Sequence, residues 1–326
     1  MSLEPSFSLV AAEGAILEEI LDLTHPVWGE GLDRASYGRY NAAQLRTPWG
    51  RSHLRRVALV DAEGRWVSTA KRYDLRVRAG GREVPALGIG ALFTRPEARR
   101  RGAASALLRA LLAAGAQEGA RVALLFSEIG TGYYERFGFR AIPVTQTVLE
   151  LTARPAAAPP AIPMRSGEPA DLPAIAEMNQ GQAGAFAFTL VRSPEYVGFA
   201  IAKKRLLAAS GVPGHREVEF FVVEEGGRAA AYAVVLAVGD YWMVTECGDR
   251  DPSGARVGAL IEAMLSRPGT RVARILAWLP PNFLPPQLSV LWRERPAVAM
   301  MAAPLGGFPL VVPHRDEVAW WHADAF

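Results

Sequence analysis

The chain has 326 residues, which is long for one domain and sufficient for two that each bury a core. Half of the residues are apolar and 21% are charged, which excludes a disordered chain, and a net charge of only +3 argues against a nucleic-acid partner. The single cysteine, Cys247, cannot form an internal disulfide. Because no apolar run approaches the ~20 residues of a membrane span, and no basic and then apolar leader opens the chain, we expect a cytoplasmic protein without a membrane partner.

The first half of the chain alternates strand-like and helix-like segments. Strands are expected at 7–10, 56–60 and 66–78, up to residue 94, at 122–126 and after residue 138, and helices at 14–23, 103–116 and 132–137. Turn residues at 61–64 and 79–82 make hairpins of the central strands. Antiparallel strands followed by a strand–helix–strand crossover predict an α+β fold, with a mixed and mostly antiparallel sheet flanked by helices.

A basic turn joins the strand ending near residue 94 to the helix that follows. The first turn of a helix has backbone N–H groups without internal partners and carries partial positive charge. Small residues there let phosphate oxygens approach the backbone, and arginines add positive charge. We therefore expect this turn to bind a pyrophosphate, through Arg99, Arg100, Arg101, Gly102, Ala103, Ala104 and Ser105. The ordinary alternative is a solvated helix start preceded by surface arginines.

The spacing Arg99-x-x-Gly102-x-Ala104 resembles the coenzyme-A-binding motif of the GNAT superfamily of N-acetyltransferases. About thirty residues further on, the segment 134–139 (Tyr-Glu-Arg-Phe-Gly-Phe) resembles the late helix and following strand of the same family. The resemblance covers residues 5–150 well. It implies acetyl-CoA as co-substrate and direct transfer of the acetyl group to a primary amine, without a metal. The five histidines also show no ligand spacing.

The resemblance also assigns roles to individual residues. Backbone groups at the end of the strand before the turn hold the acetyl carbonyl and the pantetheine amides in this family, and these groups correspond to Phe93 and Thr94. A tyrosine at the position of Tyr134 protonates the leaving thiolate. Its neighbour Tyr133 is expected to point to another face and pack. Ser127 is expected to line the pantetheine channel.

The base that removes the proton of the amine has two candidates. Glu128 follows the strand 122–126, although a surface or capping carboxylate is the ordinary alternative. Phe326 ends an aromatic tail. In the tandem acetyltransferases of the enhanced-intracellular-survival family, which this chain resembles without their sterol-carrier domain, a C-terminal carboxylate can enter the active site. Simple docking of the tail is the alternative for Phe326.

Aromatic residues after the first helix lie where acetyltransferases build the acceptor pocket. They are Trp28, Tyr37, Tyr40 and Trp49. Such rings can surround an amine and attract its charge, and core packing is the alternative. Fungal lysine N-acetyltransferases have a similar run of features here, so both small-molecule amines and lysine side chains are candidate acceptors.

A proline-rich segment divides the chain. Four prolines in residues 152–163 predict an extended linker between a catalytic domain, 1–151, and a second domain, 164–326. The second half repeats the order of the first, with strands near 164 and at 217–223, 229–238 and 241–246, and helices at 168–178 and 257–265. The fold class is thus two tandem GNAT-like domains.

Acidic residues and a proline replace the arginines at the corresponding turn of the second half, 248–254. Because carboxylates repel a pyrophosphate, we predict that this half is a degenerate copy that does not bind coenzyme A. It would shape the acceptor cavity and mediate homo-oligomerisation.

Two other function classes stay open. A non-catalytic acyl-CoA-binding sensor would not need Tyr134 as an acid. A nucleic-acid-binding role for the arginine cluster would show a steep salt dependence, and the small net charge disfavours it.

Overall fold

Two separate β-sheets organise the chain, one in each of two structural units. The computed structural model describes residues 7–152 and 162–326. Unit 1 contains the described residues up to Ile142 together with Val298–Val312 and Phe326. Unit 2 contains the described residues of Pro143–Ala297 together with Pro313–Ala325. Most of the predicted linker, 152–163, lies outside the described residues.

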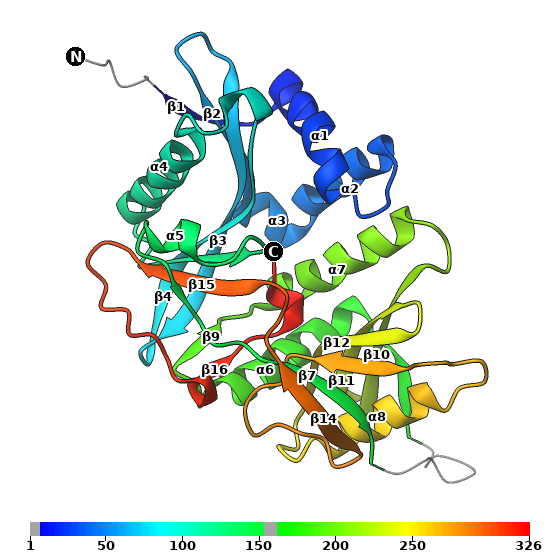
Figure 1. The fold of residues 1–326 in the computed structure, drawn as a ribbon. Helices are drawn as coiled ribbons and strands as arrows, with labels where there is room; N and C mark the ends of the chain where they lie inside the picture. The colour runs from blue at the N-terminus through cyan, green and yellow to red at the C-terminus, as the bar shows by residue number, and fades with distance from the viewer. Residues whose placement is uncertain (1–6, 153–161) are drawn as a thin grey trace. The chain divides into compact units, whose positions relative to one another are not determined.

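The sheet of unit 1 has the strand order β1-β2-β3-β4-β5-β15-β6 (Figure 1). Its strands are β1 (Ser8–Ala11), β2 (Leu54–Val60), β3 (Trp66–Ala79), β4 (Arg82–Thr94), β5 (Val122–Ser127), β6 (Arg140–Ala141) and β15 (Ala299–Pro304). Its helices are α1 (Gly14–Trp28), α2 (Arg34–Arg46), α3 (Pro48–His53), η1 (Pro96–Ala98), α4 (Ala103–Gln117) and α5 (Gly132–Glu135). All neighbouring strands are antiparallel except β4 and β5, which are parallel.

Alternating burial along the strands gives this sheet two apolar faces. Helix α4 packs on one face through Leu107, Leu108 and Leu111, which are fully buried. Helix α1 packs on the other face through Ile20, in a cluster that includes Trp66. Apolar residues at spacings of three and four place one stripe of each helix against the sheet.

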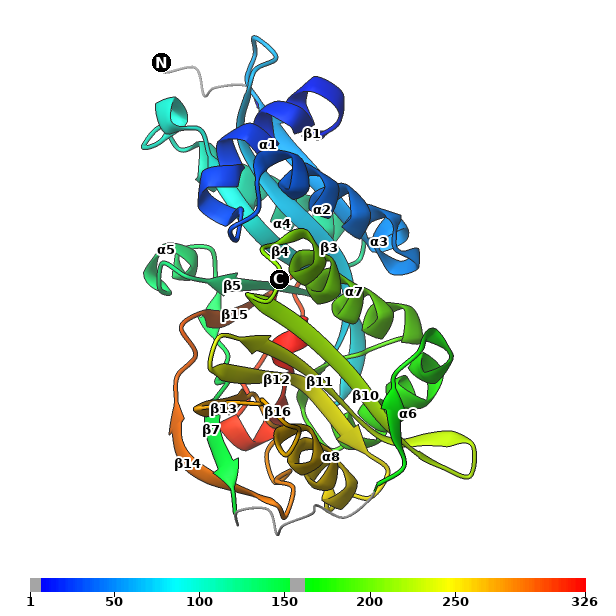
Figure 2. The ribbon, with the colours of Figure 1, turned by 90° about the vertical axis from the view of Figure 1, so that its right-hand side faces the viewer.

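The sheet of unit 2 has the order β14-β7-β13-β12-β11-β10-β8 (Figure 2). Its strands are β7 (Gln146–Leu151), β8 (Met164–Ser166), β10 (Arg216–Glu225), β11 (Arg228–Val238), β12 (Tyr241–Asp249), β13 (Arg274–Ala277) and β14 (Leu288–Glu294), and β9 (Phe188–Leu190) pairs with β16 (Val318–Ala319). Its helices are η2 (Pro169–Asp171), α6 (Leu172–Ala183), α7 (Pro194–Ser210), α8 (Ala255–Leu265), η3 (Arg315–Glu317) and η4 (His322–Asp324). Together, two mixed sheets flanked by helices confirm the predicted α+β class.

Each sheet contains one strand from the other half of the sequence. β15 lies between β5 and β6 in unit 1, antiparallel to both. β7 lies between β13 and β14 in unit 2, again antiparallel to both. This reciprocal exchange corrects the predicted boundary at residue 151, because the strand at 146–151 belongs to the second sheet and residues 298–312 belong to the first unit.

None of the helices within residues 7–152 and 162–326 has the length and apolar character needed to cross a bilayer.

Candidate coenzyme and acyl-transfer site

The parallel strands β4 and β5 separate part-way along their length. They pair from Ala86–Ile89 against Val122–Leu125, and no further pair follows within the described residues. A bulge interrupts β4 at this point, where Ala91 has a φ of 47° and the register against β3 shifts. Beyond the bulge, Phe93 and Thr94 pair with β3 alone. The β5-facing edge of β4 is therefore left for an extended ligand, which can pair with it like an added strand.

The basic turn follows directly from this edge. Arg99 donates from Nε to the carbonyl oxygen of Thr94 at 3.2 Å, which ties the turn to the end of β4. Arg100 and Gly102 both have left-handed backbone conformations, with φ of 61° and 83°. Gly102 is the N-cap of α4 and supplies no side-chain hydrogen bond to the first helical N–H groups. Arg100 and Arg101 are exposed, so the turn carries positive charge beside open N–H groups, as an anion requires.

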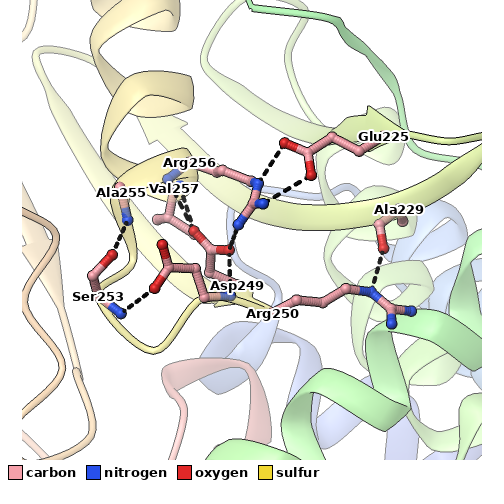
Figure 3. Close-up of polar contacts among 9 residues, drawn as sticks. Glu225, Ala229, Asp249, Arg250, Ser253, Ala255, Arg256 and Val257 are labelled. Atoms are coloured by element: carbon pink, nitrogen blue, oxygen red, sulfur yellow. Dashed lines mark hydrogen bonds and ion pairs between the residues drawn. The ribbon is translucent and has the colours of Figure 1, made fainter.

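Unit 2 has the same turn with its anion-binding groups already occupied (Figure 3). Gly254 caps α8 with a φ of 71°, as Gly102 caps α4. The buried carboxylate of Asp249 accepts from the backbone N–H groups of Arg256 at 2.9 Å and of Val257 at 3.3 Å. It also accepts from Nη1 of Arg256 at 3.0 Å. A side chain of the protein therefore fills the position that a phosphate would take at α8.

Buried charges also fill the second sheet where its parallel strands part. β12 and β13 pair only from Tyr241–Val244 against Arg274–Ala277, among the residues described. Just beyond, Glu246 is fully buried and forms an ion pair with Arg192, whose Nε lies 3.2 Å from Oδ1 of Asp324. Burial raises the pKa of Asp324 to about 6. This wedge is thus closed by the segment that precedes Phe326.

Lys203 holds the same segment of unit 2. Its Nζ donates to the carbonyl oxygen of Ala325 at 2.7 Å. Burial lowers the pKa of Lys203 to about 7, because the interior disfavours the charged ammonium.

Tyr134 lies in α5 and is 9% exposed, packed within the same apolar cluster as Phe139. Burial, with the nearby Tyr133 and the negative charge of Glu128, raises the pKa of its phenol. The hydroxyl group therefore keeps its proton at neutral pH, as a proton donor must. Tyr133 does more than pack: its hydroxyl lies 3.3 Å from Oγ of Ser105 in the first turn of α4. The spacing of Tyr133 and Ser105 in the sequence gave no signal of this contact.

The candidates at the end of β5 differ in their surroundings. Ser127 is buried, and its hydroxyl donates to the carbonyl oxygen of Gly130 at 2.5 Å. Glu128 is exposed and close enough to Tyr134 to affect its pKa. The structure thus brings Glu128 and Tyr134 together.

Phe326 lies against the centre of the unit 1 sheet. Its ring is 4.5 Å from that of Tyr73 and 5.3 Å from that of Phe126, between ring centroids. Two glycines of β4 make room for it, because a Cβ on Gly88 would lie 2.8 Å from the ring and one on Gly90 would lie 3.3 Å from the main-chain carboxyl carbon of Phe326. Phe326 is therefore next to the point where β4 leaves β5. The alternation of glycines at 88 and 90 was the available sequence signal.

The predicted acceptor residues occupy different positions. Trp28 is partly exposed and meets Phe93 edge-on, with centroids 6.1 Å apart. Tyr37 is buried, with its hydroxyl 3.2 Å from that of Thr24. Trp49 is buried and stacks on His53. Trp28 is thus brought to the end of β4, whereas Tyr37 and Trp49 are part of the packing of α2 and α3.

No cluster of three or more metal-ligating side chains occurs in the part of the chain that the structure describes.

The family of the first unit follows from a comparison with protein-family models. Residues 17–142 match the model described as the acetyltransferase (GNAT) domain. Residues 17–142 are therefore a GNAT acetyltransferase domain. This domain contains β4, β5, the basic turn and Tyr134, and its family chemistry is acyl transfer from an acyl-CoA. A search of curated proteins finds no sequence match for the chain.

Solved structures extend the fold likeness beyond the GNAT domain. A GCN5-related N-acetyltransferase from Kribbella flavida is similar at 17% identity, with a TM-score of 0.68 over 93% of this chain and 72% of that one. Eis1 from Mycobacterium abscessus matches at 15% identity and a TM-score of 0.54, over 92% and 74%. The N-myristoyltransferase of Saccharomyces cerevisiae, solved with bound myristoyl-CoA, matches at 12% identity and a TM-score of 0.53, over 93% and 84%. These likenesses show that both halves have the tandem GNAT fold.

Proposed function

We propose that the protein is an acetyl-CoA-dependent N-acetyltransferase that acetylates a primary amine. The observation that carries this proposal is the separation of β4 from β5 directly before an arginine-rich turn that opens α4. Pantetheine would pair with the free edge of β4 at Phe93 and Thr94. The diphosphate would accept from the N–H groups of residues 103–105 and from the arginines of the turn.

The transfer would proceed by direct attack. The amine nitrogen bonds to the thioester carbonyl carbon, and the carbon–sulfur bond then breaks. Tyr134 gives its phenolic proton to the departing sulfur, and the attacking nitrogen loses a proton to a base, so the products are an N-acetyl amine and free CoASH. The raised pKa of Tyr134 supports this role, because a buried phenol is protonated until the thiolate forms.

Two groups are proposed as the base. Glu128 has a carboxylate near Tyr134, and the main-chain carboxyl group of Phe326 lies beside Gly90. Glu128→Gln removes the first. Two glycines appended after residue 326 convert the second to an amide and leave the phenylalanine ring in place. The change that lowers kcat more, and shifts the acidic limb of its pH profile, identifies the base.

Only the first unit is proposed to bind the coenzyme. At α8, Asp249 already accepts from the N–H groups that a phosphate would need, and its charge would repel a diphosphate. The buried ion pairs of Glu246 and Asp324 with Arg192 fill the neighbouring wedge. Both features support the interpretation of the second half as a degenerate copy.

The test is a titration with CoASH followed by an acetylation screen. Calorimetry is expected to give one site per chain. Incubation with acetyl-CoA and a panel of amines is expected to release free thiol with at least one of them. Tight coenzyme binding with no thiol release from any amine, peptide lysines included, would replace the transferase with an acyl-CoA sensor.

A further inference from the structure

Arg56 is a buried cation without a counter-ion in unit 1. It lies on β2 with 7% of its surface exposed. Its Nη2 is 3.5 Å from Oδ1 of Asn41, and its Nη1 has no hydrogen-bond partner in residues 7–152 and 162–326. Its electrostatic neighbours are the phenols of Tyr37 and Tyr73 rather than a carboxylate, and burial lowers its pKa. A guanidinium nevertheless stays charged in proteins.

The other deeply buried arginine shows what Arg56 lacks. Arg192 in unit 2 is 3% exposed in its side chain and is surrounded by the carboxylates of Glu246 and Asp324. A buried charge is costly unless an opposite charge and hydrogen bonds compensate it. Arg56 has one half of such an arrangement, so an anion from outside the protein would complete it.

The position of Arg56 connects it to the acyl-transfer site. Side chains alternate between the faces of a sheet, and Arg56 shares its face with Ala58, which packs against α1. Tyr73, paired with Leu54 two residues before Arg56, lies on that face and contacts the ring of Phe326. Tyr73 is also paired with Gly88. The guanidinium is thus on the same sheet face as Phe326, two strands from β4.

The geometry points to an acceptor that carries a carboxylate as well as its amine, with Arg56 as the residue that binds the carboxylate. This inference rests on the proposed acetyltransferase function and adds the substrate class. The free Nη1 would donate to one carboxylate oxygen, and the phenol hydroxyl groups of Tyr37 and Tyr73 are suitable further donors. Amino acids with a side-chain amine belong to this class.

Matched amines that differ only in the carboxylate test the inference on the unaltered protein. Lysine and cadaverine form one pair, and ornithine and putrescine form another. Calorimetry on the protein saturated with CoASH is expected to show at least about tenfold tighter binding of each amino acid than of its diamine, since a charge-assisted hydrogen bond in a dry site exceeds the 1.4 kcal/mol that tenfold requires. In turnover, the same ratio is expected in kcat/KM, mainly through KM.

Two neighbouring substitutions then locate the effect. Arg56→Gln is expected to bring the ratio within each pair close to one. Arg55→Gln is the matched control, because Arg55 lies next in the chain, is exposed and pairs with Asp74 instead, and it is expected to keep the ratio.

Diamines that bind as well as amino acids would overturn the inference, as would an Arg56→Gln protein that keeps the wild-type ratio. Preferential binding of phosphoethanolamine over lysine would also overturn it, in favour of a phosphate-bearing ligand. Because binding is measured without turnover, these results are distinct from failure of the proposed function, which would appear as absence of acetylation of every amine.

Discussion

The arginines of the turn before α4 allow the coenzyme site to be tested by charge. We consider the double substitution Arg100→Gln/Arg101→Gln, because both side chains are exposed. An exposed charge contact contributes roughly 0.5–1 kcal/mol at moderate salt. Two such contacts to the phosphates therefore contribute roughly 1–2 kcal/mol, which corresponds to a roughly 5- to 30-fold change in Kd. The N–H groups at the start of α4 would retain the remaining affinity.

The matched control is Arg76→Gln/Arg82→Gln, which removes the same charge from exposed residues at the far end of the β3–β4 hairpin. Calorimetric titration with CoASH is the assay, at two salt concentrations. The turn variant is expected to bind 5- to 30-fold more weakly, roughly as estimated above, and with a smaller salt dependence, while the control stays within about twofold of wild type. Equal affinity in the two variants would refute the assignment of the diphosphate to this turn.

Three further predictions concern the acid, the second unit and its pH dependence. Tyr134→Phe is expected to lower kcat about 10²-fold or more with an unchanged Kd for CoASH, whereas Tyr133→Phe keeps kcat within about tenfold; an unchanged kcat in Tyr134→Phe would contradict the leaving-group role. Asp249→Ala leaves a buried cap and ion pair unmade, so the free energy of unfolding by urea is expected to fall by about 3–5 kcal/mol, against less than about 1 kcal/mol for the exposed partner change Glu225→Gln; similar small losses in both would contradict the capping account. Because burial lowers the pKa of Lys203 to about 7, the unfolded chain binds more protons between this value and the ordinary lysine range, so stability is expected to rise with pH above 7; Lys203→Met should flatten the thermal unfolding profile there, and a slope equal to wild type would contradict it.

Local patterns in the sequence predicted most elements of both sheets. Turn residues at 61–64 and 79–82 correctly marked the ends of β2, β3 and β4, since glycines there adopt the left-handed conformations that hairpins need. The helix after Gly102 was also found, because its apolar stripe and its glycine cap are both local signals. Such signals depend on neighbouring residues and are readable from one chain.

The strand exchange was not predictable in this way. β7 and β15 have strand-like sequences, but the choice between two equivalent gaps, beside β5 or beside β13, depends on contacts between residues about 150 positions apart. The pair Gln146–Leu151 followed the elements of the first half directly, so proximity in sequence favoured the wrong sheet.

The candidate site shows the same division between local and distant information. The basic turn was visible as three consecutive arginines and a glycine. Arg56 was not visible, because Arg55 and Arg56 are adjacent on β2 and only the packing of α2 decides which of them is buried. The hollow formed by Gly88 and Gly90 likewise has meaning only once Phe326 fills it.

A crystal structure of the full chain with CoASH tests the central claim most directly. The account predicts one coenzyme per chain, with its diphosphate on the N–H groups at residues 103–105 and its pantetheine along Phe93 and Thr94, and with Asp249 still capping α8. A coenzyme bound at α8, or density for the diphosphate away from Gly102, would contradict it.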